Sequence, residues 1–288
     1  CNGTTGTLTV SGQSATSKKW QQSPNGRNTC TDVTPGSGYA TNSFTTTALS
    51  ATTYYRVAAS CNSGDWSDQV NSVTVITMTV PSATYYVNDN SQTGDVHTTA
   101  VGNNSNNGTG ASTPKLTLAA ALSIASAPAV IYVDAGTYTD EAMTLSTDNI
   151  SIIGAGRELT IFDQNGTNDR FMSITGTATN ISITDMTLTT YNEANVHGGV
   201  FNITSTGSVT LQDINFTDNY IAGYNKYGGA IYASSGTNVT VDRCKFKGNY
   251  AQANNYGGAI LSSGTMTIQN CLFYDNYAAY LGGALYMG

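Results

Sequence analysis

The sequence predicts an all-β protein, with a small β-sandwich over residues 1–80 and a parallel β-helix over residues 81–288. Only 10% of the 288 residues are charged, while 30 are glycine and 18 are tyrosine. This mixture suits strands and turns and leaves little long helix. In the C-terminal part an apolar pattern and a paired glycine both recur. Their period of about 25–30 residues is typical of a solenoid.

The apolar pattern begins at Ile181, Val209, Val239 and Met266. Its copies are ISITDMTLTT, VTLQDINFTDNY, VTVDRCKFKGNY and MTIQNCLFYDNY. Apolar residues lie at offsets 0, 2, 5 and 7, so the alternation slips by one residue between the second and third of them. Each copy therefore predicts two short strands joined by a bend.

A Gly-Gly pair before small and branched residues separates the copies, at 198–199, 228–229, 257–258 and 282–283. We expect each coil to be a strand, a bend, a strand, a turn and a further strand. Stacked coils place like residues above one another. The predicted structural ladders are Phe216, Phe246 and Phe273; Asn219, Asn249 and Asn276; and Cys244 and Cys271, which follow Ile214. We expect the two cysteines to stay reduced, because parallel stacked side chains seldom present the dihedral of a disulfide.

Short strand-like runs divided by turn residues fill the first 80 residues. The stretches CNGTTGTLTVSG, KKWQQSPNG and LSATTYYRVAASC resemble immunoglobulin-like modules of secreted surface proteins of Bacteroidota. The resemblance implies a disulfide between Cys1 and Cys61 near Trp20, with Cys30 as a free thiol. Pairing of Cys30 with Cys61 is the alternative. Either disulfide would imply an oxidising, extracellular location.

A second unit begins near Val80-Pro81. TYYVNDNSQTG leads into the loop GNNSNNGTGASTPK, the one helical pattern LTLAAALSIASA, and then IYVDAGTYTD. This order resembles the entrance of right-handed parallel β-helix proteins of the pectin-lyase-like class. It implies that residues 117–127 form a short capping helix over the open end of the core.

The repeats also pair Phe-x-x-Asn, at 216–219, 246–249 and 273–276, with Gly-Gly-Ala-[Ile/Leu]. This pairing resembles the repeats of the polymorphic outer-membrane proteins of chlamydiae and of related β-helix adhesins. The asparagines are interpreted as a hydrogen-bonding ladder inside a turn, which is a structural role.

Enzymes on this fold use clustered Asp residues, or Ca²⁺ with an Arg, to cut polysaccharides. Asp185 and Asp213 share one offset of the repeat, but Asp242 falls one residue earlier, so no clean acidic row forms. We therefore assign no catalytic residues. No cofactor and no metal site are expected. Ca²⁺ held by Asp89, Asp95 and the Asn-rich loop 103–107 is the alternative.

Tyrosines are the candidate ligand-binding residues. One row, just after Phe-x-x-Asn, consists of Tyr220, Tyr250 and Tyr277. A second set lies beside the glycine pairs and consists of Tyr227, Tyr256 and Tyr280. Rows of flat rings could stack on sugars, whereas the alternative is that they pack over neighbouring loops. His197, before Gly198-Gly199, is interpreted as a turn residue.

The formal net charge of -7 argues against nucleic acid as a partner, and no apolar run reaches transmembrane length. The chain opens at Cys1 without a signal peptide and stops after a glycine turn, so we expect a piece of a longer protein. The prediction is a non-catalytic, secreted adhesin or stalk that binds glycans or another surface.

By resemblance, such a protein would be exported by type IX secretion machinery, anchored at the cell outer membrane and used in gliding motility. The alternatives are a polysaccharide lyase or glycoside hydrolase of the pectin-lyase-like class, or a structural subunit of a surface fibre.

Overall fold

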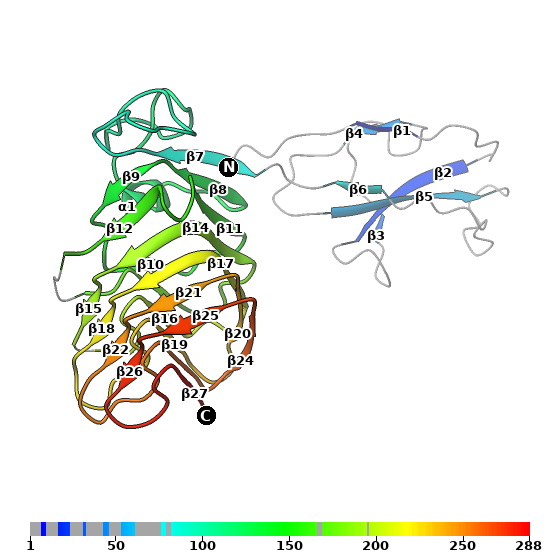
Figure 1. Ribbon diagram of the computed structural model, residues 1–288. Helices are drawn as coiled ribbons and strands as arrows, with labels where there is room; N and C mark the ends of the chain where they lie inside the picture. The colour runs from blue at the N-terminus through cyan, green and yellow to red at the C-terminus, as the bar shows by residue number, and fades with distance from the viewer. Residues whose placement is uncertain are drawn as a thin grey trace. The chain divides into compact units, whose positions relative to one another are not determined.

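The structure is a computed structural model. It describes residues 82–165, 169–194 and 196–288, together with the strand segments 7–9, 17–23, 31–32, 43–45, 53–60 and 76–78. The chain divides into two compact units, Cys1–Pro81 and Ser82–Gly288. In the described residues each unit is all-β apart from one short helix in the second (Figure 1).

The described strands of the first unit pair antiparallel. β1 (Thr7–Thr9) pairs with β4 (Ser43–Thr45), and a second sheet has the order β3 (Thr31–Asp32), β2 (Ser17–Ser23), β5 (Thr53–Ser60) and β6 (Ile76–Met78). The Trp20 side chain is fully buried. The immunoglobulin-like assignment stays a prediction, and Cys1, Cys30 and Cys61 lie outside the described residues.

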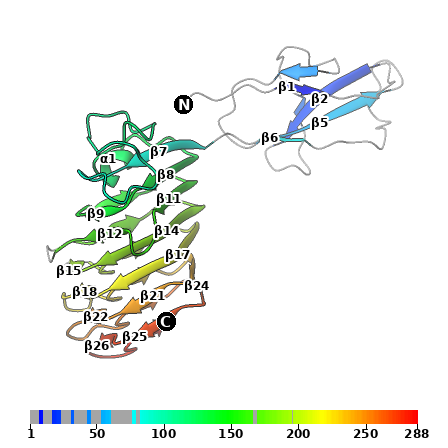
Figure 2. The same cartoon turned by 45° about the horizontal axis from the view of Figure 1, so that its top comes forward.

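The second unit is a parallel β-solenoid built from three sheets (Figures 1 and 2). The largest, here the bent sheet, carries the predicted apolar pattern. Its first row of strands is β7 (Ala83–Val87), β8 (Ala129–Val133), β11 (Ile150–Gly154), β14 (Ile181–Thr189), β17 (Ser208–Thr217), β20 (Asn238–Asp242) and β24 (Thr265–Gln269). Beyond the bend the separate strands are β9 (Gly136–Tyr138), β12 (Thr160–Asp163), β21 (Lys245–Lys247) and β25 (Leu272–Tyr274).

Two smaller sheets complete the solenoid. The short sheet was not predicted, because its strands have only two residues each: β15 (Asn192–Glu193), β18 (Tyr220–Ile221), β22 (Tyr250–Ala251) and β26 (Tyr277–Ala278). The glycine sheet follows the glycine pairs in the later coils. Its strands are β10 (Met143–Leu145), β13 (Met172–Ile174), β16 (Phe201–Ile203), β19 (Ile231–Ala233), β23 (Ile260–Ser262) and β27 (Leu285–Met287).

A left-handed residue makes the bend that the slipped alternation predicts. Asp185, Asp213, Arg243 and Asn270 occupy the same position of successive coils and have φ between 50° and 62°. Asp and Asn tolerate this region better than other L residues. One such residue reverses the alternation, so the apolar residues on both sides of the bend face inward. In the coil that begins at Ser208, Val209, Leu211, Ile214 and Phe216 are at most 1% exposed.

The two glycines of each pair are required for different structural reasons. The first, represented by Gly228, has φ +76°, a conformation that a side chain would strain. A Cβ on the second, Gly229, would lie 2.0 Å from the carbonyl oxygen of Gly258 in the next coil. The pair therefore lets adjacent coils approach at a tight turn, which explains its recurrence.

Aromatic rings stack along the core. Phe216 pairs in register with Phe246, and Phe246 with Phe273. Both pairs of ring centroids are 4.6 Å apart, with interplanar angles of 4° and 2°. Burying one such side chain stabilises a fold by about 1.5–3 kcal/mol. The interior is thus a column of like side chains.

A buried amide ladder runs beside this column. Asn249 Oδ1 accepts hydrogen bonds from the Asn219 backbone N (3.2 Å) and Nδ2 (2.9 Å). Its Nδ2 donates to the Phe216 carbonyl (3.0 Å) and to Asn276 Oδ1 (2.9 Å). Asn219 and Asn249 are fully buried. Each asparagine side chain therefore provides hydrogen-bond partners to backbone groups of the preceding coil, at a turn where the strands do not pair.

The edge of β7 is covered by the loop that follows it. The Tyr86 N–H donates to the Gly108 carbonyl (2.8 Å), and the Lys115 N–H donates to the Tyr86 carbonyl (2.8 Å). Helix α1 (Leu118–Leu122) lies at the same end of the solenoid (Figure 2). Because strand edges left open invite further pairing, this loop and helix close the end.

Helix α1 is shorter than the predicted span of 117–127. Leu118 and Ala121 are fully buried, and the Thr117 side chain accepts the N-cap hydrogen bond from the Ala120 N–H at 3.2 Å. After Leu122 the backbone tightens into i→i+3 turns, with the Ile124 N–H donating to the Ala121 carbonyl at 3.2 Å. These i→i+3 turns end the α-helix at Leu122.

Replacing Asn249 with Ala is expected to destabilise the solenoid. The change leaves the Asn219 amide and the Phe216 carbonyl buried without this partner, at a cost of about 1–3 kcal/mol for each such group. The midpoint of urea unfolding should fall clearly. Asn254→Ala, at an exposed asparagine of the same coil, is the control and should change it little. Equal midpoints for the two variants would contradict a structural role for the ladder.

Candidate functional site

The Tyr220 row lies on the outside of the short sheet, with its rings covering one another. Ring centroids are 5.2 Å apart from Tyr220 to Tyr250 and 5.1 Å from Tyr250 to Tyr277, with interplanar angles of 15° and 12°. The Tyr220 hydroxyl also donates to Gln252 Oε1. Sugars could not stack on these ring faces as predicted, because neighbouring tyrosine rings already cover the faces. Ring edges and hydroxyls remain on the outside.

A different arrangement occurs at the glycine sheet, where rings meet edge to face. Tyr256 contacts Tyr227 at 5.2 Å and 72°, Tyr280 at 5.1 Å and 79°, and Tyr286 at 4.8 Å and 59° between ring planes. A hollow of about 320 Å³ opens beside them. We call it the aromatic hollow; its lining includes Tyr227, Tyr232, Tyr256, Leu261, Ser263 and Tyr286.

His197 supports one wall of the hollow. Its ring stacks on Tyr227 (4.9 Å, 14°) and on Tyr232 (4.3 Å, 20°). Its Nδ1 accepts a hydrogen bond from the Tyr227 backbone N–H at 3.2 Å. Burial, followed by the nearby charges of Lys226 and Arg170, lowers the pKa of His197. The imidazole is therefore neutral near pH 7 and acts as a packed turn residue.

A buried ion pair holds the His197 turn. Arg170 Nη2 lies 2.8 Å from Glu193 Oε2, and the two side chains are only 6% and 4% exposed. Arg170 Nη1 donates to the His197 carbonyl at 2.9 Å. Because breaking a buried pair on one side is strongly destabilising, this contact keeps the wall of the aromatic hollow in place.

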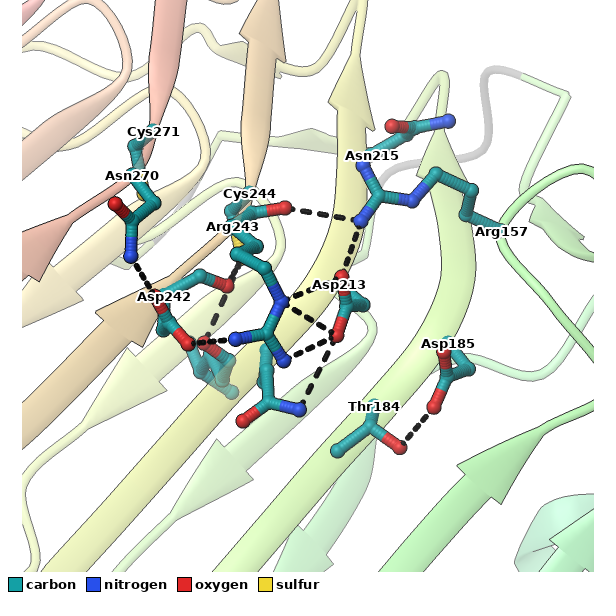
Figure 3. A network of polar contacts seen from close by, with 12 residues as sticks. Arg157, Thr184, Asp185, Asp213, Asn215, Asp242, Arg243, Cys244, Asn270 and Cys271 are labelled. Atoms are coloured by element: carbon teal, nitrogen blue, oxygen red, sulfur yellow. Dashed lines mark hydrogen bonds and ion pairs between the residues drawn. The ribbon is translucent and has the colours of Figure 1, made fainter.

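The bends of the bent sheet carry a charged cluster (Figure 3). Arg157 Nη2 lies 2.6 Å from Asp213 Oδ1, and Arg243 Nη2 lies 2.8 Å from Asp213 Oδ2. Arg243 Nη1 is 2.5 Å from Asp242 Oδ2. The hydrogen bond from Arg243 lowers the pKa of Asp213, and the charge of Arg157 acts in the same direction. Asp213 is thus a paired carboxylate whose ionised form is favoured.

The three aspartates that could have formed an acidic row are not brought together as an acid and a base. Asp185 accepts from Thr184 Oγ1 at 2.7 Å, away from the arginines (Figure 3). Asp242 is 5% exposed and also accepts from Asn270 Nδ2 at 2.9 Å. General acid catalysis needs a carboxyl group whose pKa is raised. Asp213 has the opposite shift.

Basic side chains continue beyond this cluster. The Nζ atoms of Lys245 and Lys247 lie 5.4 Å and 6.0 Å from the centroid of the Tyr274 ring. Cations over an aromatic face are weakly attracted to it. Both lysines lie on β21 and face Tyr274 of β25.

The carboxylates of the Ca²⁺ alternative accept hydrogen bonds from the protein itself. Asp89 Oδ1 accepts from the Ser91 N–H at 2.7 Å, and Asp95 Oδ2 accepts from Asn88 Nδ2 at 2.8 Å. Asp134, fully buried nearby, accepts hydrogen bonds from the backbone N–H of Val96 and of three further residues. Among the described residues, no three His, Cys, Asp or Glu side chains gather as metal ligands.

Cys244 and Cys271 are free thiols at the position just before the paired Lys245 and Leu272. Cys244 is 2% exposed, and its Sγ lies 3.5 Å from the Leu211 carbonyl oxygen. The hydrogen bond with Cys271, together with burial, raises the pKa of Cys244. Cys244 therefore points inward, whereas Cys271 is half-buried.

Sequence reasoning missed Tyr232, Tyr286 and Arg157. Tyr232 and Tyr286 each follow a glycine pair at the first outward position of the glycine sheet, in register with Leu261 between them. That recurrence was a usable signal. Arg157 lies 56 residues before Asp213, and no repeat position identifies it, so only the fold brings the two together.

Residues 1–81 match a family described as Domain of unknown function (DUF8696). No curated protein matches the chain in sequence. Among solved structures, a rhamnogalacturonan lyase is 16% identical with a TM-score of 0.37; the match covers 70% of this chain and 62% of that one. No helix in the described part of the chain is long and apolar enough to span a membrane.

Stability should depend on the protonation of His197. Its pKa in the folded state lies below the usual value of about 6.5, so its contribution is complete above that pH and is lost as pH falls through the folded pKa. The melting temperature of the wild type should therefore fall as the pH is lowered from about 7 to about 5. His197→Phe should lack this dependence, whereas His97→Gln should retain it. A slope unchanged in His197→Phe would refute the assignment.

The ion pairs of Asp213 predict a second dependence of stability on pH, in a more acidic range. Because its folded pKa is lowered, its stabilising contribution is present above the unfolded value of about 3.9 and disappears as pH falls through the folded pKa. Asp213→Asn should lower the melting temperature at neutral pH and approach the wild type in acid. Asp148→Asn, outside the cluster, is the control. A difference from wild type that is independent of pH would argue against the ion pairs.

Proposed function

We propose that the chain is a non-catalytic, glycan-binding part of an adhesin or stalk protein at a cell surface. The observation that carries the proposal is the outer aromatic surface, where Tyr227 and Tyr256 precede successive glycine pairs and line a hollow. Exposed aromatic side chains offer apolar area beside polar hydroxyls, which suits a polyol ligand. The solenoid spaces such side chains by one coil.

The charged cluster supports a non-catalytic function. Asp213 is paired with two arginines, and Asp242 is paired with one of them and bonded to Asn270. These contacts link coils across the bend and leave neither carboxylate as a general acid. Display outside the cell, type IX export, attachment at the outer membrane and a part in gliding belong to the same proposal, and rest on the sequence resemblance.

The test is to incubate the chain with neutral and acidic polysaccharides, with and without Ca²⁺, and to measure both polysaccharide length and bound protein. We expect binding with unchanged chain lengths. The triple variant Asp185→Asn, Asp213→Asn, Asp242→Asn should leave that result the same, provided that its melting curve shows a folded protein. Shortened polysaccharide that disappears with the variant would favour a lyase or hydrolase. Ordered self-association without binding would favour a fibre subunit.

A further inference from the structure

The aromatic hollow has no charged side chain in its lining. Four tyrosines, Leu261 and Ser263 line it together with Gly288. By contrast, Arg157, Asp213 and Arg243 gather at the bends, which belong to a different sheet. A carboxylate placed against the apolar rings would lose hydration, and no lining side chain would offer it a counter-charge. The cations Lys226 and Arg170 lie beside His197 and are not among the lining residues. The lining therefore favours an uncharged ligand.

The phenol hydroxyls of the hollow are available. Within the described part of the chain, the hydroxyls of Tyr227, Tyr232, Tyr256 and Tyr286 make no hydrogen bond to protein. Elsewhere the Tyr224 hydroxyl accepts from Asn254 Nδ2 at 2.6 Å, so surface tyrosines of this solenoid do take partners where a polar side chain is near. A phenol both donates and accepts. A ligand rich in hydroxyl groups matches this rim.

The packing of the rings leaves room for an apolar face of the ligand. Tyr256 meets Tyr227 at 72° and Tyr286 at 59°, so these three rings do not close over one another as those of the Tyr220 row do. His197 covers one face of Tyr227 and one face of Tyr232, and the other face of each ring is not stacked on a described neighbour. Leu261, 5% exposed, lies between Tyr232 and Tyr286 in register. The volume of about 320 Å³ is at the lower end of small-ligand sites, about 300–1,000 Å³.

From these three features we infer that the aromatic hollow binds an uncharged sugar unit of a neutral polysaccharide. The C–H faces of the sugar pack on the tyrosine rings and on Leu261, while its hydroxyls bond to the phenols. The inference rests on the proposed glycan-binding function and adds the site and the charge class of the ligand.

The experiment measures binding of the whole chain to galactomannan and mixed-linkage β-glucan as neutral probes, and to polygalacturonate as the acidic probe. We expect a neutral probe to be bound with an affinity that changes little with salt, because no ion pair is involved. Tyr232→Ala should weaken that binding roughly tenfold or more, as expected for a central aromatic contact. Tyr232→Phe keeps the ring and should therefore lose less binding affinity than Tyr232→Ala.

Tyr250→Ala is the matched control, since it removes a half-buried tyrosine from the self-stacked row. Melting curves establish that each variant is folded; if Tyr232→Ala is not, Tyr256→Phe and Tyr232→Phe carry the test. Binding only of polygalacturonate, or loss of binding in Tyr250→Ala alone, would overturn the inference but leave glycan binding standing. Binding of none of the three probes would remove both the inference and its basis.

Discussion

Parallel, in-register pairing between coils is the constraint on which the rest of the solenoid depends. Adjacent strands lie about 4.8 Å apart, so each side chain meets its counterpart in the next coil. Phenylalanine stacks on phenylalanine at 4.6 Å, and asparagine bonds to asparagine at 2.9 Å. Positions that break the strand follow the same rule. The bend has a left-handed residue in each of the four coils with Asp185, Asp213, Arg243 and Asn270. The tight turn has a glycine where a Cβ would lie 2.0 Å from the carbonyl oxygen of the next coil.

The same register produces two unlike aromatic surfaces. Where the outward tyrosine follows an inward asparagine, the rings of Tyr220, Tyr250 and Tyr277 share one orientation and cover each other's faces. Beside the glycine pairs, Tyr256 meets its neighbours edge to face and leaves a hollow. Equal spacing along the axis thus leads to a closed stack in one place and an open site in the other, because the local turn sets the ring angle.

The charged side chains show why carboxylates on neighbouring coils need not form a catalytic site. Arg157 and Arg243 reach Asp213 from two other coils, and the resulting ion pairs hold the pKa of that carboxylate low. Arg243 itself adopts a left-handed backbone, a conformation unusual for a long side chain; its contacts to Asp213 and Asp242 hold it there. The cluster therefore ties coils together at the bend.

By itself, the sequence determined the parallel solenoid, the bend and the inward positions of Phe216 and Cys244, because a repeat encodes contacts between residues at equal offsets. The capping segment was also visible, although α1 ends five residues before the predicted limit of 127, since turn hydrogen bonds compete with the helix there. Only the tertiary structure decided which surface is open. Turns of different coils differ in sequence, and their contacts set the ring angles, the pairing of Arg157 with Asp213 and the hollow around Tyr232. A periodic sequence pattern does not encode contacts between unlike turns.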